Sequence, residues 1–359
     1  MLGYDMSVSE RGVRGTFVKE FLTRHRKAKY TQLCTVVDSD KEEEKYAMIG
    51  TLPQLAEVGD ERVLAGFMDR SYTLKNLIYM TGIRIPRTMF EHDQTGQIRT
   101  LVQSMGARVS NFPDKLAFTA LGAGTVDICY DGKAMFAATH LGSGDTANQN
   151  NIVTSANVSN ALLDAAVAGG KTDRDNLIAE LQADLWRAIA AISIMVDDRG
   201  EPWHEDAEAP GLVILCHPKL APAMNIVVNG DIISDTSNLT KGLVNRVMQT
   251  NYPQPFTDTG GPTARYATWF LAKVDTPIQP LIFQRFGPKT SFPDTIPEAD
   301  QGPLKALQSV EVQTIMRGGD MISAHTFFDD EFLVGARAEY KVGYGMWQNM
   351  IMVKSSDWA

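Results

Sequence analysis

The chain has 359 residues, 44% of them hydrophobic and 21% charged, so it holds enough apolar sequence to bury a core and is not a disordered protein. Its formal net charge of −9 argues against a protein that coats nucleic acid through a broadly basic surface. No stretch approaches the ~20 apolar residues of a membrane span, and the first thirty residues lack the apolar run of a signal peptide. The three cysteines form no Cys-x-x-Cys pair. We therefore expect a protein that stays in the cytoplasm, without disulfides or a zinc finger.

The first fifty residues differ from the rest in charge pattern. Residues 11–29 carry seven basic side chains against one acid, Glu20, and the sign reverses over residues 38–45. Large apolar side chains are few in this region, so the pattern predicts an extended arm that needs something else to pack on. The basic residues of this arm are Arg11, Arg14, Lys19, Arg24, Arg26, Lys27 and Lys29.

Residues 52–87 predict a long hairpin. A turn signal occupies residues 57–62, residues 72–85 have strong strand propensity, and Pro86 ends the strand. Charges near the expected tip favour a finger exposed to solvent or to a partner. These charged residues are Glu57, Asp60, Glu61, Arg62, Asp69 and Arg70.

The middle of the chain predicts two helices. Apolar residues at three- and four-residue steps indicate one helix from about 95 to 121, which bends or restarts at Pro113. The same spacing predicts a second helix over residues 172–194. Between them, residues 126–136 predict two short strands around the Asp131-Gly132 turn.

The last third of the chain predicts mainly strands. The fully apolar run 212–216 is typical of a strand buried on both faces, followed by a helix over 219–226. Nine of the 16 prolines lie in residues 253–303, which predicts loops there, with strands only at 269–274 and 281–285. Strict alternation predicts a strand over 334–344, with one face covered.

No template for catalysis is complete. Ala165 occupies the first glycine position of a phosphate-binding loop, and Glu208 stands where a zinc protease has its second histidine. Ser143 has Leu141 and Asp145 where a nucleophile elbow needs glycine two residues to either side. Adjacent Cys216 and His217 would point to opposite faces of a strand. We therefore predict no catalytic residues, no cofactor and no metal.

Six stretches match, in order along the chain, a pattern found in one family of phage proteins. They are 46–53 (YAMIGTLP), 72–87, 112–121 (FPDKLAFTAL), 129–140 (CYDGKAMFAATH), 269–284 (WFLAKVDTPIQPLIFQ) and 332–347 (FLVGARAEYKVGYGMW). As an ordered set they resemble the Mu-like prophage major head subunit (gpT) family of tailed-phage capsid proteins. The resemblance implies an α+β, Hong Kong 97-like capsid fold. Its parts would be an N-terminal arm (1–48), an extended-loop hairpin (49–88), a peripheral domain with a long spine helix (89–171), an axial domain (172–320) and return strands to the peripheral domain (321–359).

The resemblance also implies a function. The chain would be a major capsid protein that self-assembles as pentamers and hexamers into the icosahedral head of a tailed bacteriophage. The head would enclose double-stranded DNA without sequence-specific binding, and a separate scaffolding protein and portal would assist assembly in the host cytoplasm. The alternatives are an encapsulin-like compartment shell, or a cytoplasmic hydrolase that uses His217 or His140.

The role of the basic arm has two interpretations. It could contact phosphates, or it could pair with an acidic patch such as residues 38–44 of an adjacent subunit, and we favour the subunit contact. In either case we expect deletion of residues 1–29 to leave a folded chain that assembles poorly.

Overall fold

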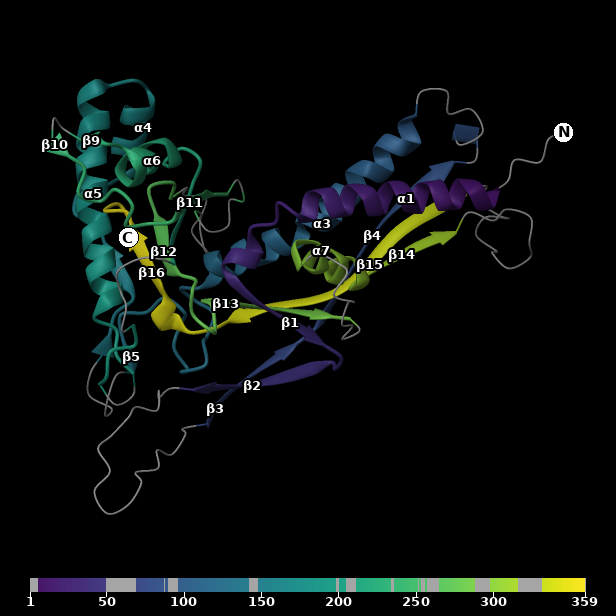
Figure 1. Cartoon of the computed structure of the whole chain (residues 1–359), viewed down its shortest axis with the longest axis horizontal. Helices are drawn as coiled ribbons and strands as arrows, with labels where there is room; N and C mark the ends of the chain where they lie inside the picture. The colour runs from purple at the N-terminus through teal and green to yellow at the C-terminus, as the bar shows by residue number, and fades with distance from the viewer. Residues whose placement is uncertain are drawn as a thin grey trace, which may run out of the picture.

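The structure of the chain is a computed structural model that combines helices with two five-stranded sheets (Figure 1). The α+β content expected from the sequence is confirmed. The structure describes residues 6–49, 69–86, 88–89, 96–141, 148–197, 200–204, 211–233, 236–250, 252, 256, 265–287, 298–315 and 331–358.

The first sheet is built around β15 (Glu331–Tyr344), a strand of 14 residues. One edge of β15 pairs with β4, and the other edge pairs first with β14 and then with β13. β1 extends this sheet by pairing in parallel with β13. Side chains along β15 alternate between buried and half-buried, as the predicted strand 334–344 requires. The partner strands are β1 (Cys34–Ser39), β4 (Leu77–Pro86), β13 (Leu281–Phe286) and β14 (Val310–Ile315).

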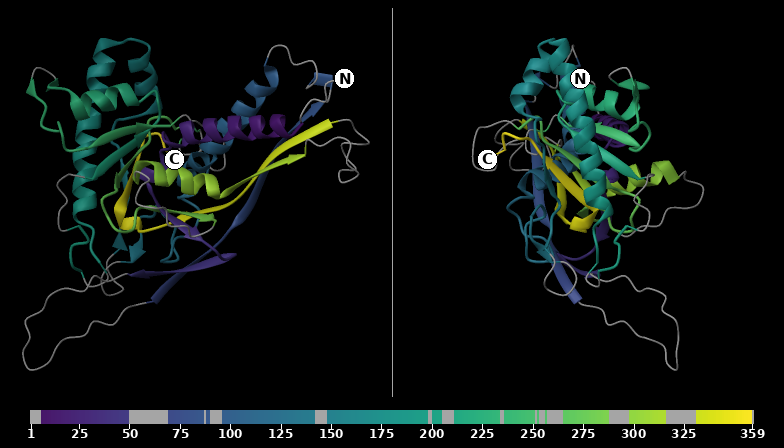
Figure 2. Two further views of the ribbon diagram at one scale, coloured as in Figure 1. Left: turned by 45° about the vertical axis from the view of Figure 1, so that its right-hand side comes forward. Right: turned by 90° about the vertical axis from the view of Figure 1, so that its left-hand side faces the viewer.

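Three helices lie on one side of the first sheet, α1 (Met6–His25), α3 (Gln97–Ala123) and α7 (Glu298–Gln308) (Figures 1 and 2). α1 and α3 approach closely, since a Cβ atom on Gly106 would lie 3.0 Å from the carbonyl oxygen of Phe17. The hydroxyl of Ser110 on α3 also donates a hydrogen bond to the carbonyl oxygen of Phe21 at 3.1 Å. α3 continues through Pro113, so the predicted long helix is confirmed without a restart.

The turn after α1 is held by a carboxylate of α3. Asp114 Oδ1 accepts hydrogen bonds from the backbone amides of Lys29, at 2.9 Å, and Tyr30, at 2.7 Å. A short 3₁₀ helix (Tyr30–Gln32) follows and leads directly into β1. α1, the turn after it and β1 are therefore all held against α3 and the first sheet.

The second sheet has the strand order β11-β8-β12-β16-β7. Strand β8, which lies between β11 and β12, is buried at all five positions, which confirms the predicted strand 212–216. α5 packs on α4, α6 and β16, and α6 packs on β11. The elements are β7 (Ile152–Thr154), β8 (Leu212–Cys216), β11 (Arg246–Gln249), β12 (Trp269–Lys273), β16 (Met350–Lys354), α4 (Asn160–Val167), α5 (Lys171–Ser193) and α6 (Ala221–Asn229).

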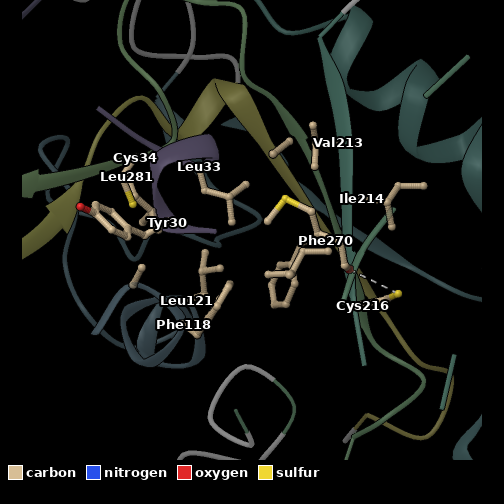
Figure 3. Packing of buried hydrophobic residues seen from close by; sticks show 14 of the residues in the cluster. Tyr30, Leu33, Cys34, Phe118, Leu121, Val213, Ile214, Cys216, Phe270 and Leu281 are labelled. Atoms are coloured by element: carbon tan, nitrogen blue, oxygen red, sulfur yellow. Dashed lines mark hydrogen bonds between the residues drawn. The ribbon is translucent and has the colours of Figure 1, made fainter. Parts of the chain in front are cut away.

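The two sheets share one hydrophobic core. Figure 3 shows Phe118 and Leu121 of α3 facing Leu33 and Leu281 on one side of this core, with Phe270 of β12 beyond them. The chain passes from β15 through a 3₁₀ helix (Trp347–Asn349) into β16, so consecutive residues serve both sheets. This shared packing makes the described residues one body.

A separate two-stranded ribbon projects from the body (Figure 2). It pairs β2 (Glu43–Ile49) with β3 (Asp69–Lys75), and it ends at Asn76, whose side chain donates to the carbonyl oxygen of Lys41 at 3.0 Å. Two further small ribbons pair β5 (His140–Leu141) with β6 (Asn148–Gln149) and β9 (Ile232–Ile233) with β10 (Thr236–Ser237).

The prediction of an extended N-terminal arm is wrong for residues 6–49. Val13, Phe17 and Phe21 are buried at four-residue spacing, so they form one stripe that seats α1 on α3. The segment therefore has a hydrophobic contact within its own chain, and β1 and β2 follow it. Because deletion of residues 1–29 would expose the facing surface of α3, the structure leads us to expect that this deletion destabilises the fold.

Three other predictions need correction. The hairpin expected over 52–87 begins earlier, at β2, and β4 belongs to the first sheet because the chain changes sheets at Asn76. Residues 126–136 form one isolated bridge between Ile128 and Ala134, not two strands. The proline-rich region contains α7, with Pro303 inside it, where only loops and edge strands were expected.

We predict that Phe17→Ala destabilises the chain by about 3–5 kcal/mol, because the buried ring of Phe17 stacks on Phe21 and its loss leaves a cavity against α3. Lys19→Ala, at an exposed position of the same helix, should stay within about 0.5 kcal/mol of the wild type. Urea unfolding measures both. Equal effects of the two changes would mean that α1 is not docked in solution.

We also predict that acid weakens the same contact. Burial, together with the nearby positive charge of Arg285, lowers the pKa of His25 from 6.5 to about 4. The unfolded chain therefore takes up this proton first, so the contribution of His25 to stability is constant above about pH 6.5 and falls by up to about 3 kcal/mol as pH drops to 4. Unfolding measured across pH 4–8 should show a shallower slope for His25→Gln than for the wild type. Identical slopes would contradict the assignment.

Candidate assembly surfaces

The seven basic residues expected in the arm lie on α1 and in the turn that follows it. Arg24 forms an ion pair with Glu20 at 2.8 Å, and Arg14 donates to the carbonyl oxygen of Val312 on β14 at 3.4 Å. Lys29 donates to the carbonyl oxygen of Gln249. These three residues therefore have partners within the chain. Arg11, Lys19 and Lys27 are exposed and form no ion pair with a described residue, and Arg26 is also exposed.

Three of the acidic residues over 38–44, proposed as their partners on a neighbour, have contacts within the subunit. Asp38 pairs with Arg285, and Glu42 pairs with Lys75 at 2.7 Å. Glu44 Oε1 accepts a hydrogen bond from the hydroxyl of Ser39 at 3.0 Å. These carboxylates are largely used inside the subunit.

The six charged residues assigned to the extended loop divide into two groups. Asp69 and Arg70 lie on β3, where their backbones pair with Ile49 and Met48. The base of this ribbon is tied to the first sheet, since the Tyr46 hydroxyl donates to Gln284 Oε1 at 2.8 Å. The other four residues, Glu57, Asp60, Glu61 and Arg62, lie outside the described residues.

One face of the first sheet is open over β4, β14 and the first half of β15 (Figure 1). Apolar side chains of β4 are exposed on it, with Ile78 54% and Met80 69% exposed. Its charges are balanced, because Arg337 contacts Glu311 and Glu339 and Arg84 lies 4.0 Å from Glu331. Apolar side chains among paired charges are typical of protein contact surfaces.

A shallow depression of about 300 Å³ lies in this open face. It arises where Gly82 of β4 pairs with Gly335 of β15, which in turn pairs with Gln313 of β14, so two of the three strands contribute no side chain. The sequence analysis placed β4 in the hairpin and so missed this face. The alternation of Ile78, Met80 and Gly82 along β4 was the signal that could have found it.

The second-sheet region also exposes large apolar side chains. Ile194 follows α5 and is 75% exposed, and Leu239 is equally exposed in the loop after β10. Trp186 lies on α5 and is 45% exposed. Apolar exposure therefore occurs at both ends of the subunit.

The Cys216–His217 pair is not arranged for nucleophilic catalysis. Cys216 is fully buried, and burial raises the pKa of its thiol to about 12. Burial and then Lys219 lower the pKa of His217 to about 4, while the imidazole stacks on Tyr266 at 4.1 Å. The thiol therefore stays protonated at neutral pH, and catalysis needs the thiolate.

His140 is a structural residue of the core. It is fully buried, its ring stacks on Trp347 at 4.0 Å, and its Nδ1 lies 2.6 Å from Asp131 Oδ2. Although burial alone would raise it, the pKa of Asp131 is lowered by the hydrogen bond and charge of His140. The imidazole is thus held in the core against Trp347.

The described residues contain no group of three or more His, Cys, Asp or Glu side chains that could hold a metal ion. Among the helices that the structure describes, none is both long and apolar enough to cross a membrane.

The closely packed helices, the 14-residue strand and the projecting ribbon match a known fold. A capsid protein from the capsid of cyanophage P-SCSP1u superposes with a TM-score of 0.51 at 11% sequence identity, covering 91% of this chain and 88% of that one. The fold is thus the Hong Kong 97-like α+β fold of phage capsid subunits, as expected.

The family follows from the sequence pattern. The pattern that defines the Mu-like prophage major head subunit gpT matches residues 8–168 and 246–357, and the chain belongs to this family of capsid structural proteins. The Mu-like prophage FluMu major head subunit of Haemophilus influenzae is 34% identical over 113 residues, which cover 32% of this chain and 37% of that protein. The major capsid protein of Escherichia phage Mu is 30% identical over 132 residues, or 35% and 43%. The aligned part of the chain thus spans less than half the length of these curated relatives.

We predict that the three thiols are inert in the native protein. Cys34, Cys129 and Cys216 are buried, and burial raises the pKa of each. A colorimetric thiol reagent at pH 8 should therefore detect no fast-reacting group before denaturation and three after it. One equivalent reacting rapidly in the native state would contradict the inert assignment and reopen nucleophilic catalysis.

Proposed function

We propose that this head subunit self-assembles, as pentamers and hexamers, into an icosahedral shell that encloses double-stranded DNA. The observation that carries the proposal is the family match, because residues 8–168 and 246–357 include every strand of the first sheet and all but β8 of the second. Most of the strands that build the fold therefore lie in the part of the chain that the family shares, while β8, α5 and α6 lie outside it.

The surfaces of the subunit support assembly on physical grounds. The open face of the first sheet leaves Ile78 and Met80 in water, and each gains roughly 25 cal/mol for every Å² of apolar surface buried. Repetition around a closed shell multiplies such modest contacts. In this proposal the ribbon β2–β3, with the loop that joins its strands, reaches a neighbouring subunit.

The parts of the subunit keep their expected roles as proposals. The first sheet with α1 and α3 would form the peripheral domain, and the second sheet with α4, α5 and α6 would form the axial domain at capsomer centres. The limits of the peripheral domain (89–171) and the axial domain (172–320) stay predictions.

Several partners also belong to this proposal. A separate scaffolding protein and a portal would act during assembly in the host cytoplasm, and the mature subunit would reside in the virion. No cofactor and no catalytic activity are needed, since shape and repeated contact perform the function. The buried state of Cys216 and His140 supports a structural role over a hydrolase.

We predict that the purified wild-type chain forms closed particles and that Met80→Lys does not. An ammonium group at this position would be buried without a partner in a subunit contact, at a cost of several kcal/mol. Val126→Lys, at a 62% exposed position after α3, is the matched control and should assemble like the wild type. Negative-stain microscopy and sedimentation measure the yield.

The contents of the particles test the nature of the shell. Nucleic acid inside particles made during infection or induction supports the phage head, whereas a packaged enzyme would support an encapsulin-like compartment. A wild-type chain that stays monomeric at high concentration would contradict self-assembly. If Met80→Lys gives the same particle yield as the wild type, the open face of the first sheet is not a contact surface between subunits.

A further inference from the structure

The helical side of the first sheet differs in charge from the rest of the subunit. Residues 6–31 and 97–123, which form α1, the turn after it and α3, contain ten basic residues and three acidic residues. The whole chain has a net charge of −9, so the remainder is strongly acidic. The positive charge of this protein is therefore concentrated in one layer of two helices, which we call the basic helical layer.

Two of the three acids of this layer have partners within it. Glu20 pairs with Arg24 at 2.8 Å. Asp114 is buried and accepts hydrogen bonds from the backbone amides of Lys29 and Tyr30. The basic residues of the layer therefore far outnumber its acids. Six basic side chains are exposed and form no ion pair with a described residue: Arg11, Lys19, Lys27, Arg99, Arg108 and Lys115.

The opposite side of the same sheet shows what a compensated surface looks like in this subunit. Its cations Arg84 and Arg337 each lie within ion-pair distance of a glutamate, and exposed apolar side chains lie between them. A surface with balanced charge and apolar contacts suits a second protein copy. A surface with uncompensated positive charge suits a polyanion.

Three of the acidic residues that the sequence offers as partners on a neighbouring subunit have contacts within their own subunit, Asp38 with Arg285, Glu42 with Lys75 and Glu44 with Ser39. These contacts weaken the interpretation that the basic residues pair with residues 38–44 of a neighbour. They favour the other interpretation, that the basic residues contact phosphates.

We propose that the basic helical layer faces the interior of the shell and contacts the phosphate backbone of the enclosed double-stranded DNA. This inference rests on the proposed function, because it requires DNA inside the shell. The other exposed residues of α1 and α3 are mostly glycine, serine, threonine and asparagine, and none is aromatic. Small polar groups hydrogen-bond phosphates, whereas aromatic side chains would be needed to stack on bases. The contact is thus independent of DNA sequence.

The contact is also weak for each subunit. A few exposed cations on an otherwise acidic protein give salt-sensitive attraction, so DNA can slide during packaging and release. Many copies acting together hold the outermost DNA against the shell.

The test uses the full-length, unassembled chain and a random-sequence DNA duplex, with binding followed by fluorescence anisotropy from about 50 to about 200 mM salt. The variant changes Lys19, Lys27, Arg108 and Lys115 to glutamine. The matched control changes four exposed basic residues elsewhere, Lys45, Lys133, Arg174 and Arg246, to glutamine. If all four layer residues contact phosphates, the slope of log affinity against log salt should fall by about 3.6 in the variant, at roughly 0.9 per contact, and stay unchanged in the control.

Three outcomes would overturn the inference. The wild type could fail to bind DNA at low salt, or both variants could lose affinity equally. Alternatively, poly-glutamate could displace the duplex as well as unlabelled DNA does at equal charge, which would assign the layer to an acidic protein such as a scaffold. Particle formation by the same two variants, scored by negative stain, separates this result from the proposed function. If the wild type forms shells but does not bind DNA, the DNA-contact inference is wrong and the proposed function still stands.

Discussion

The organisation of this subunit depends on one constraint: β15 can be covered by helices on only one of its faces. Phe332, Val334 and Ala336 point into the core beneath the helices, so their neighbours along the strand must occupy the other face. The β2–β3 ribbon contacts one end of that second face, where Leu74 lies against Gly343, whereas Ile78 and Met80 beside it on β4 are exposed. In a free subunit, helices therefore cover one face of the sheet and the other face is exposed. We propose that neighbouring subunits cover the exposed face in the shell.

The N-terminal segment is not an extended arm in this structure because α1 packs on α3, on the helix-covered face of the sheet. α1 approaches α3 closely because Gly106 has no side chain, and Phe17 and Phe21 then fill the space between the helices. Once α1 is docked, the basic side chains of Arg11, Lys19 and Arg24 on it are exposed. The same helix thus completes the core of the subunit and supplies much of the charge that we assign to DNA contact.

Elements whose periodicity is strong were predictable from the sequence. α3, α5, β8 and β15 each carry an apolar pattern that continues for the length of the element. α1 was missed because its large apolar residues were judged by their number, whereas their four-residue spacing carries the information. The exchange of sheets at Asn76 was not predictable, because β3 and β4 read as one strand and only partners distant in sequence separate them. Charge compensation, such as Asp38 with Arg285, also depends on pairing across about 250 residues and leaves no local pattern.

The account assigns the two sides of the first sheet to different partners, copies of the chain on one side and DNA on the other. A cryo-electron microscopy reconstruction of particles assembled from the full-length chain tests this assignment most directly. The account predicts α1 and α3 lining the inner wall, with density from a neighbouring subunit over Met80 and the Gly82–Gly335 depression. A reconstruction with the helices on the outer surface, or with the sheet face bare in every subunit, would contradict it.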